Sequence, residues 1–314
     1  MHIQFLGTGA GMPSKQRNVT AIALSLLDEI GEVWLFDCGE ATQHQIMHTA
    51  IRPRRIRNIF ITHMHGDHIY GLPGLLGSRS FLGGEEPLTV YGPKGIKPFI
   101  EATIQLSKTH LNYELNVVEI DEGIILETDA FIVKASRLQH VVDCFGYRIE
   151  QKPLPGQLQI EKALQLGVPK GPLLRELKLG HDVQLDNGNV VKSNDVVTPP
   201  KSGFTVTILG DTRYCEESVK LANNADIVVH EATFDKENSQ LARDYGHSTN
   251  VEAAIVAKEA HAKHVILTHI SARFLEKDAI KLLTEAKEHF EHSYIANDFD
   301  LFEWKNEQLF QNSK

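Results

Sequence analysis

The sequence has few cysteines, no long apolar run and no excess of basic residues. Its three cysteines, Cys38, Cys144 and Cys215, are odd in number and far apart, which predicts no disulfide framework and fits a reducing cytoplasm. No apolar stretch approaches the roughly 20 residues that span a bilayer. The N-terminus also lacks the basic and apolar regions of a signal peptide. We therefore expect a cytoplasmic protein with no membrane partner.

The net charge of the 314 residues is −9 at pH 7. Taken alone, this argues mildly against a nucleic-acid partner, because phosphate binding normally uses a basic face. Net charge can hide local clusters, however, and two are visible: a run at Arg52, Arg54, Arg55 and Arg57, and a weaker group at Lys170, Arg175 and Lys178. Each is either a solvated surface or a binding face, and the sequence leaves both interpretations open.

Short β-branched runs alternate with longer helical patterns, which is typical of a layered α/β fold. A helix is predicted to begin near Thr249, because Thr249 and Glu252 have the spacing of a capping box, and to run to Ala262. The predicted strands are Ile3–Leu6, Thr20–Leu26, Val33–Asp37, Ile59–Thr62, Leu88–Tyr91, Asn116–Ile120, Phe131–Ala135, Phe145–Ile149, Thr205–Leu209, Ile227–His230, Val265–Thr268 and Tyr294–Ala296.

Segment 151–200 differs from the rest of the chain, because it holds many of the prolines and glycines and no long apolar run. We predict that it is an insertion protruding from a domain formed by residues 1–150 and 201–314. Loops of this length are usually functional or mobile. The alternative is a disordered connector.

The segment THMHGDHIYG (62–71) contains the pattern H-x-H-x-D-H, formed by His63, His65, Asp67 and His68. Such a cluster is hard to explain as packing, because buried polar groups need partners and a surface loop gains no stability from them. His63 and His65 can project to one side of an extended turn. Gly66 permits a bend, after which Asp67 and His68 can face a second point. Imidazole and carboxylate together suit zinc.

Three further candidate ligands, His140, Asp211 and His269, each follow a predicted strand. Folds of the α/β class gather ligands beyond the C-terminal ends of their strands. A lone loop histidine usually has no such role, but the shared placement favours a common site. Asp211 is the natural carboxylate to bridge two metals, which together stabilise the attacking and leaving oxygens in phosphoryl displacement. The residues thus predict a two-metal hydrolase.

This ligand pattern resembles that of the metallo-β-lactamase superfamily, which includes lactamases, thioesterases, oxidoreductases and nucleases. Further motifs make almost the whole chain similar to the short form of the ribonuclease Z family of tRNA 3′-processing endonucleases. They are FLGTGAGMPSKQRN (5–18), LFDCGEATQHQ (35–45), HEAT (230–233) and HST (247–249). The segment GVPKGPLLRELKLG (167–180) resembles the arm with which that family grips the tRNA elbow. The resemblance implies a metallo-β-lactamase αββα sandwich, an α/β fold, with a protruding Gly/Pro-rich arm at 151–200 that binds tRNA.

The resemblance also implies two zinc ions (Zn2+) per chain and a mechanism. The implied ligands are His63, His65, His140 and Asp211 for the first zinc, and Asp67, His68, Asp211 and His269 for the second. Zinc-bound hydroxide would attack the phosphorus after the discriminator nucleotide, and Asp67 would orient it and accept its proton. The products would be a tRNA with a 3′-hydroxyl and a trailer with a 5′-phosphate.

Other residues carry implied roles around the cleavage point. His247 is the candidate to assist the leaving 3′-oxygen, since histidine titrates near neutral pH, and Glu231 would orient it. Asp37 would support the metal site. Candidate substrate contacts are Lys15, Arg17, Ser271 and Arg273. The expected partners are a tRNA precursor and a second copy of the chain, whose surface could include the Arg52–Arg57 run.

Two other hypotheses remain open at this stage. One is a hydrolase of small phosphodiesters or thioesters on the same fold, which would have no use for a long arm. The other is a non-catalytic RNA-binding protein, which a complete ligand set disfavours.

Overall fold

The computed structural model describes residues 1–312 and divides into two compact units. Unit 1 combines Met1–Ile149 with the chain from Thr205 onward, and unit 2 is Glu150–Phe204. The segment predicted as an insertion, 151–200, lies inside unit 2.

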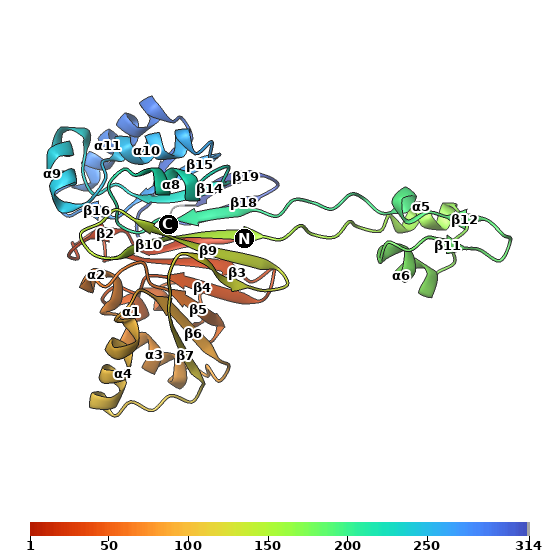
Figure 1. The fold of residues 1–314 in the computed structure, drawn as a ribbon, viewed down its shortest axis with the longest axis horizontal. Helices are drawn as coiled ribbons and strands as arrows, with labels where there is room; N and C mark the ends of the chain where they lie inside the picture. Colours follow the sequence, from red (N-terminus) through yellow and green to blue (C-terminus); the bar gives the residue numbers. More distant parts are fainter. Residues whose placement is uncertain (313–314) are drawn as a thin grey trace. The chain divides into compact units, whose positions relative to one another are not determined.

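Unit 1 contains two large sheets (Figure 1). The first has the order β19-β18-β1-β3-β4-β5-β6-β7. Its strands are β1 (His2–Gly7), β3 (Ala21–Leu26), β4 (Glu32–Phe36), β5 (Ile56–Phe60), β6 (Leu88–Gly92), β7 (Leu115–Glu119), β18 (Leu301–Lys305) and β19 (Gln308–Asn312).

The second sheet has the order β17-β15-β14-β13-β10-β9-β8. Its strands are β8 (Gly123–Glu127), β9 (Phe131–Leu138), β10 (Cys144–Gln151), β13 (Thr205–Ile208), β14 (Ile227–Glu231), β15 (His264–Thr268) and β17 (Ser293–Ile295). All the predicted strands are therefore confirmed, with ends shifted by a few residues.

Aromatic side chains fill the space between the two sheets. Trp34 on β4 packs edge-on against Phe131 on β9, with ring centroids 5.4 Å apart, and Tyr147 on β10 lies 5.4 Å from Phe60 on β5. These rings are almost fully buried. The contact between facing sheets buries large apolar areas and holds the sandwich together.

Helices cover the outer face of each sheet (Figure 1). Those over the first sheet are α1 (Thr42–Met47), α2 (Gly66–Ile69), α3 (Leu72–Phe81) and α4 (Ile96–Ser107), with a short 3₁₀ helix, η1 (Pro53–Arg55). Those over the second are α8 (Glu216–Leu221), α10 (Asn250–Glu259) and α11 (Glu276–His289), whereas η2 (Lys236–Asn238) and α9 (Ser239–Tyr245) follow β14 and lead to the loop that holds His247. The predicted αββα sandwich is thus confirmed, and α10 begins with the predicted Thr249–Glu252 capping box.

The strand directions bring several loops to one edge of the sandwich. β4 and β5 run parallel in the first sheet, as do β13, β14 and β15 in the second. Parallel neighbours end at the same edge, so the loops that follow them are gathered there. A short parallel pair, β2 (Gly9–Ala10) with β16 (Ile270–Ser271), joins the N-terminal loop to the segment after β15.

Unit 2 is a small packed body and not the disordered connector that the sequence left open. It contains α5 (Ile160–Gln165), α6 (Pro172–Lys178) and α7 (Ser193–Val196), and a hairpin of β11 (Val183–Gln184) and β12 (Val190–Val191). Its own core includes the buried side chains of Ala163, Val168, Leu177, Val191 and Val196.

The two ends of unit 2 lie side by side. The Gln151 amide donates to the Phe204 carbonyl at 2.9 Å, and Leu154 and Lys201 exchange backbone hydrogen bonds of 2.9 and 3.0 Å.

Within the described residues, no helix is both long and apolar enough to cross a lipid bilayer.

Candidate metal centre

The histidine motif begins directly after β5 and is anchored by Asp37, which follows β4. The Thr62 amide and hydroxyl donate to the two carboxylate oxygens of Asp37 at 2.8 and 2.9 Å. Asp37 has a left-handed backbone, with φ of 58°, a strained conformation that functional sites often retain. The Asp37 carboxylate also accepts from His68 Nδ1 at 2.7 Å. This bond fixes the His68 ring so that Nε2 faces the centre of the site.

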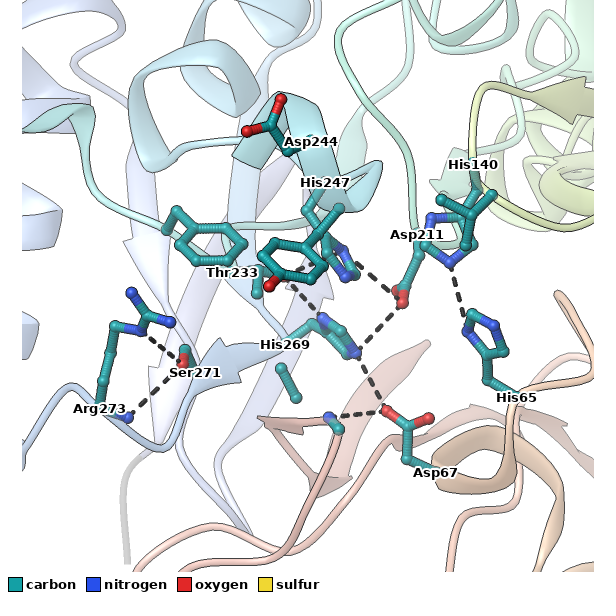
Figure 2. A pocket seen from close by; sticks show the side chains of 15 residues that line it. His65, Asp67, His140, Asp211, Thr233, Asp244, His247, His269, Ser271 and Arg273 are labelled. Atoms are coloured by element: carbon teal, nitrogen blue, oxygen red, sulfur yellow. Dashed lines mark hydrogen bonds and ion pairs between the residues drawn. The ribbon is translucent and has the colours of Figure 1, made fainter. Parts of the chain in front are cut away.

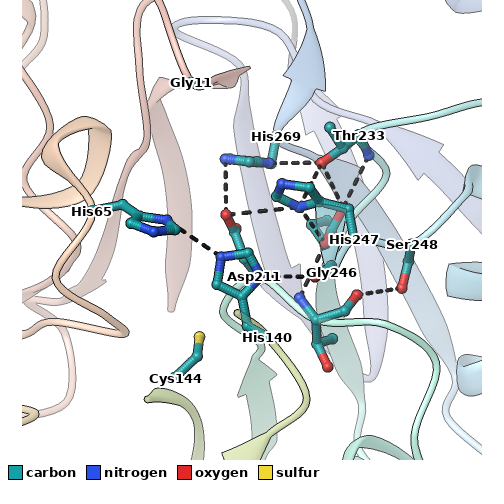
Figure 3. A network of polar contacts seen from close by, with 12 residues as sticks. Gly11, His65, His140, Cys144, Asp211, Thr233, Gly246, His247, Ser248 and His269 are labelled. Atoms are coloured by element: carbon teal, nitrogen blue, oxygen red, sulfur yellow. Dashed lines mark hydrogen bonds and ion pairs between the residues drawn. The ribbon is translucent and has the colours of Figure 1, made fainter. Parts of the chain in front are cut away.

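Three histidines form the first half of the centre. His63 Nε2 lies 3.1 Å from His65 Nδ1, and His65 Nδ1 lies 3.3 Å from His140 Nε2. His140 Nδ1 donates to the Gly246 carbonyl at 2.7 Å, which turns the other ring nitrogen toward His65 (Figure 3). His63 is fully buried, whereas His65 and His140 are half-buried.

Asp67, His68 and His269 form the second half. His68 Nε2 lies 3.3 Å from His269 Nε2, and Asp67 Oδ2 lies 3.4 Å from both nitrogens. The Thr233 hydroxyl lies 2.8 Å from His269 Nδ1 and orients the ring (Figure 2). The Gly11 amide donates to Asp67 Oδ2 at 2.8 Å, so the N-terminal loop helps to fix this carboxylate.

Asp211 lies between the two halves. Its Oδ2 is 3.6 Å from His63 Nε2, 3.5 Å from His68 Nε2 and 3.4 Å from His269 Nε2. Gly210 permits this approach, because a Cβ there would lie 2.6 Å from Cys144 Sγ and 2.7 Å from Thr62 Cβ. Asp211 therefore occupies the position of a bridging carboxylate.

The geometry fits metal ions better than it fits hydrogen bonds alone. Ligands about 2.0–2.1 Å from a tetrahedral zinc stand roughly 3.3–3.4 Å apart. Most of the spacings above are close to that value. Several of these spacings separate two imidazole nitrogens, and others place three groups around one carboxylate oxygen. Direct hydrogen bonds would not favour either arrangement. The nitrogen and oxygen donors are also those that zinc and related divalent ions prefer.

The buried charges point the same way. Burial lowers the pKa of His63 well below its ordinary value, so the ring is a neutral ligand. Burial opposes ionisation of Asp211, but nearby His269 and His68 lower its pKa well below the usual range. Burial likewise opposes a charge on His68, yet the Asp37 and Asp211 carboxylates raise its pKa well above the usual value. Without a metal, a proton on His68 offsets these carboxylates, and a bound cation would take its place.

His247 and Glu231 lie beside this centre. His247 Nδ1 is 2.9 Å from Glu231 Oε1, and the buried Glu231 also accepts from the hydroxyl and amide of Thr233 and from the Thr212 amide. Burial alone would lower the pKa of His247, but the Glu231 carboxylate raises it to about 9. A protonated imidazole at neutral pH is suited to donate a proton to a leaving group.

A cavity of about 390 Å³ opens above the metal centre and is lined by His65, Asp67, His140, His247 and His269 (Figure 2). Ser271 and Arg273, two of the predicted substrate contacts, also line it. Arg273 Nε donates to Ser271 Oγ at 3.2 Å, and its guanidinium lies over the Phe234 ring. Lys15 is exposed on the N-terminal loop.

Arg17 lies elsewhere than the predicted substrate contact requires. Its side chain is buried, and the guanidinium donates to Thr8 Oγ1 at 2.6 Å, the Ala296 carbonyl at 2.7 Å and Asn297 Oδ1 at 2.8 Å. These bonds tie the N-terminal loop to the loop before β18. Arg17 is therefore a structural residue of this loop, which corrects the expectation of a substrate contact.

Comparisons with known proteins agree with this geometry. A family model described as anti-Pycsar protein Apyc1 matches residues 1–153. The ribonuclease Z proteins of Bacillus anthracis and of Bacillus cereus strain AH820 are each 58% identical over 303 residues, covering 96% of this chain and 99% of the relative. The chain belongs to the ribonuclease Z family.

Solved structures support the same assignment. The short form of human tRNase Z has a TM-score of 0.69 and 31% identity, covering 96% of this chain and 99% of the human chain. A metallo-β-lactamase fold protein from Bacillus subtilis, with a TM-score of 0.66 and 20% identity, covers 99% of both chains and shares the fold. In the ribonuclease Z fold of this chain, the predicted ligands from four separate loops meet at one centre.

Sequence reasoning missed several groups that orient this centre. The Gly11 amide, the Thr233 hydroxyl and the Gly246 carbonyl each fix a predicted ligand. Two of these groups belong to the backbone, whose contacts leave no signal in residue type. Thr233 ends the HEAT motif, so that motif could have indicated it.

Proposed function

We propose that this chain removes the 3′ trailer from tRNA precursors, leaving a 3′-hydroxyl on the tRNA and a 5′-phosphate on the trailer. As a member of the ribonuclease Z family, it is a tRNA 3′-processing endonuclease, a hydrolase of phosphodiester bonds. The proposal is supported by the convergence of four histidines, His63, His65, His68 and His269, with the carboxylates of Asp67 and Asp211 at the base of one cavity, which His65, Asp67, Asp211 and His269 line.

The metal is zinc in this proposal, with two ions per chain. His63, His65 and His140 would hold one ion and Asp67, His68 and His269 the other, and Asp211, whose Oδ2 lies 3.4 to 3.6 Å from His63, His68 and His269, would contribute to both. When bound, the ions lower the pKa of a water molecule toward 7 and neutralise charge on the scissile phosphate.

The protein groups then handle two protons. The Gly11 amide donates to Oδ2 of Asp67. The other carboxylate oxygen, Oδ1, does not bond that amide and accepts the proton of the attacking water. Nearby His269 and His68 lower the pKa of Asp67 well below its usual range despite burial, so the carboxylate is ionised when water and metal bind. His247 donates the second proton to the leaving 3′-oxygen, and Glu231 holds the His247 ring in place.

Unit 2 serves as the tRNA-binding arm. Lys170, Arg175 and Lys178 are exposed on α6 and the turn before it, and their charges suit contact with phosphates. A small arm of this kind gives local positive charge to a chain whose total charge is negative. We further propose that the protein acts as a homodimer in the cytoplasm.

Removing unit 2 separates tRNA processing from small-molecule hydrolysis. Because Gln151 and Phe204 are adjacent, residues 152–203 can be replaced by a two-residue Asn-Gly turn. We expect kcat/KM for a 3′-extended pre-tRNA to fall by about 10²-fold or more, since several phosphate contacts are lost. Hydrolysis of bis(p-nitrophenyl) phosphate should stay within about twofold of the intact chain.

The matched control replaces Lys170, Arg175 and Lys178 by glutamine in the full chain. This variant should lose part of the pre-tRNA activity and keep the small-substrate activity. Equal loss of both activities in the deletion variant would mean that unit 2 is needed for folding, and would count against its role as an arm.

Metal analysis tests the two-ion assignment. The purified chain should hold close to two zinc ions, and chelation should abolish hydrolysis until zinc is restored. His269→Ala removes one ligand of the second ion, so it should retain about one zinc. A wild-type content below one zinc per chain would contradict the assignment.

A further inference from the structure

A second hollow, of about 510 Å³, lies next to the metal cavity. The two share Gly11, His65 and Asp67 in their walls. Beyond these shared residues, the second hollow is lined by Met12 and Tyr70 and by the acidic Glu40. An RNA strand that crosses the metal centre would therefore pass over the shared residues from one hollow to the other.

Tyr70 is held at the edge of this hollow by the metal-binding loop itself. Its amide donates to the Gly66 carbonyl at 2.9 Å. Its ring packs against Gly66 so closely that a Cβ there would lie 2.1 Å from a ring carbon. Nevertheless, 66% of the Tyr70 surface is exposed, and Met12 in the same hollow is 63% exposed. The ring is thus fixed in position while much of its surface stays open.

The direction of the substrate follows from the proposed function, on which this inference rests. His247 lines the first cavity only and is assigned to the leaving 3′-oxygen, which belongs to the tRNA. The last tRNA nucleotide therefore lies in the first cavity. The phosphate leaves with the trailer, so the first trailer nucleotide continues past Asp67 into the second hollow.

We propose that Tyr70 stacks on the base of the first trailer nucleotide. An aromatic ring accepts every base, because each base has a π-face, and this suits trailers of differing sequence. The carboxylate of Glu40 disfavours a phosphate in the same hollow, whereas an uncharged base is compatible with it. Tyr70 is accordingly a substrate-binding residue that positions the trailer and not a group that takes part in proton transfer.

The test compares two pre-tRNAs that differ only at the first trailer position, one with adenosine and one with an abasic ribose. Wild type should cleave the adenosine substrate with a kcat/KM about tenfold higher, mostly through KM, since one stacked base contributes on the order of that factor. Tyr70→Ala should cleave both substrates at the lower value. Tyr70→Phe, which keeps the ring, should behave as wild type.

The preference for adenosine is the ratio of two kcat/KM values measured on the same enzyme preparation. A misfolded fraction lowers both values by the same factor and leaves the ratio unchanged. The zinc content of Tyr70→Ala, compared with that of wild type, measures whether the metal-binding loop is retained. An undiminished preference for adenosine in Tyr70→Ala would overturn the stacking proposal. A fall in kcat/KM by the same factor on both substrates would overturn it as well. Failure of the wild type to cleave either pre-tRNA would overturn the proposed function instead, and the stacking proposal with it.

Discussion

Asp67→Ala should lower the rate of pre-tRNA cleavage by about 10⁴-fold while the fold is retained. The change removes a metal ligand and the acceptor for the proton of the attacking water. A positioned base alone contributes about 10² to 10⁴ in rate, and the lost ligand adds to that. Single-turnover cleavage of a labelled pre-tRNA measures the effect, with circular dichroism and thermal unfolding as checks on folding.

The matched control is Asp28→Ala, which removes an exposed aspartate outside the metal centre. It should cleave at the wild-type rate. A rate for Asp67→Ala within tenfold of wild type would contradict both roles of Asp67. Asp67→Asn is a useful companion, because it keeps an oxygen for the Gly11 amide but can no longer take up a proton.

His247→Ala should have the second-largest effect, and the effect should depend on the leaving group. On pre-tRNA the leaving 3′-oxygen is a strongly basic alkoxide that needs a proton, so we expect a loss of about 10²- to 10³-fold. The p-nitrophenolate of bis(p-nitrophenyl) phosphate is stable without one, so that hydrolysis should fall less than about fivefold. Parallel kcat/KM measurements on the two substrates check the prediction. Equal losses on both would indicate that His247 only supports the metal site.

The pH profile gives a second test of the same residue. His247 acts in its protonated form, and its pKa is raised to about 9. Cleavage by wild type should therefore persist at neutral pH and fall as the pH rises through that region. In Glu231→Gln the stabilising carboxylate is gone, so the pKa of His247 drops and the activity should be lost at lower pH. A profile of kcat/KM between pH 6 and 10 measures this shift, and an unmoved alkaline limb would exclude the pairing.

Much of the core fold could be predicted from the sequence, because its strands are short β-branched runs with clear ends. Two of the strands that were missed lie at sheet edges. β8 lies at an edge of the second sheet and begins at a glycine with positive φ, and β19 at an edge of the first sheet carries polar residues such as Gln308 and Asn312. Edge strands bury less apolar surface, so their sequences carry a weaker pattern.

The predicted metal ligands could be found because each follows a strand and because histidine and aspartate have few other reasons to cluster. The supporting contacts could not be found in this way. Arg17 shares the N-terminal motif with Lys15, but its guanidinium is used by Thr8 and Asn297, the latter 280 residues away in the chain. The role of Tyr70 likewise depends on the packing of its ring against Gly66. Such pairings are set by the tertiary fold, which local sequence does not encode.

As proposed above, this metal centre cuts one phosphodiester bond of a tRNA precursor with a defined polarity. Incubation of the zinc-loaded chain with a 3′-extended pre-tRNA, followed by mapping of both new ends, tests it most directly. We expect a single cut after the discriminator nucleotide, a 3′-hydroxyl on the tRNA, a 5′-phosphate on an intact trailer, and loss of all products in Asp67→Ala. A ladder of shortened trailers, or a trailer with a 5′-hydroxyl, would contradict it.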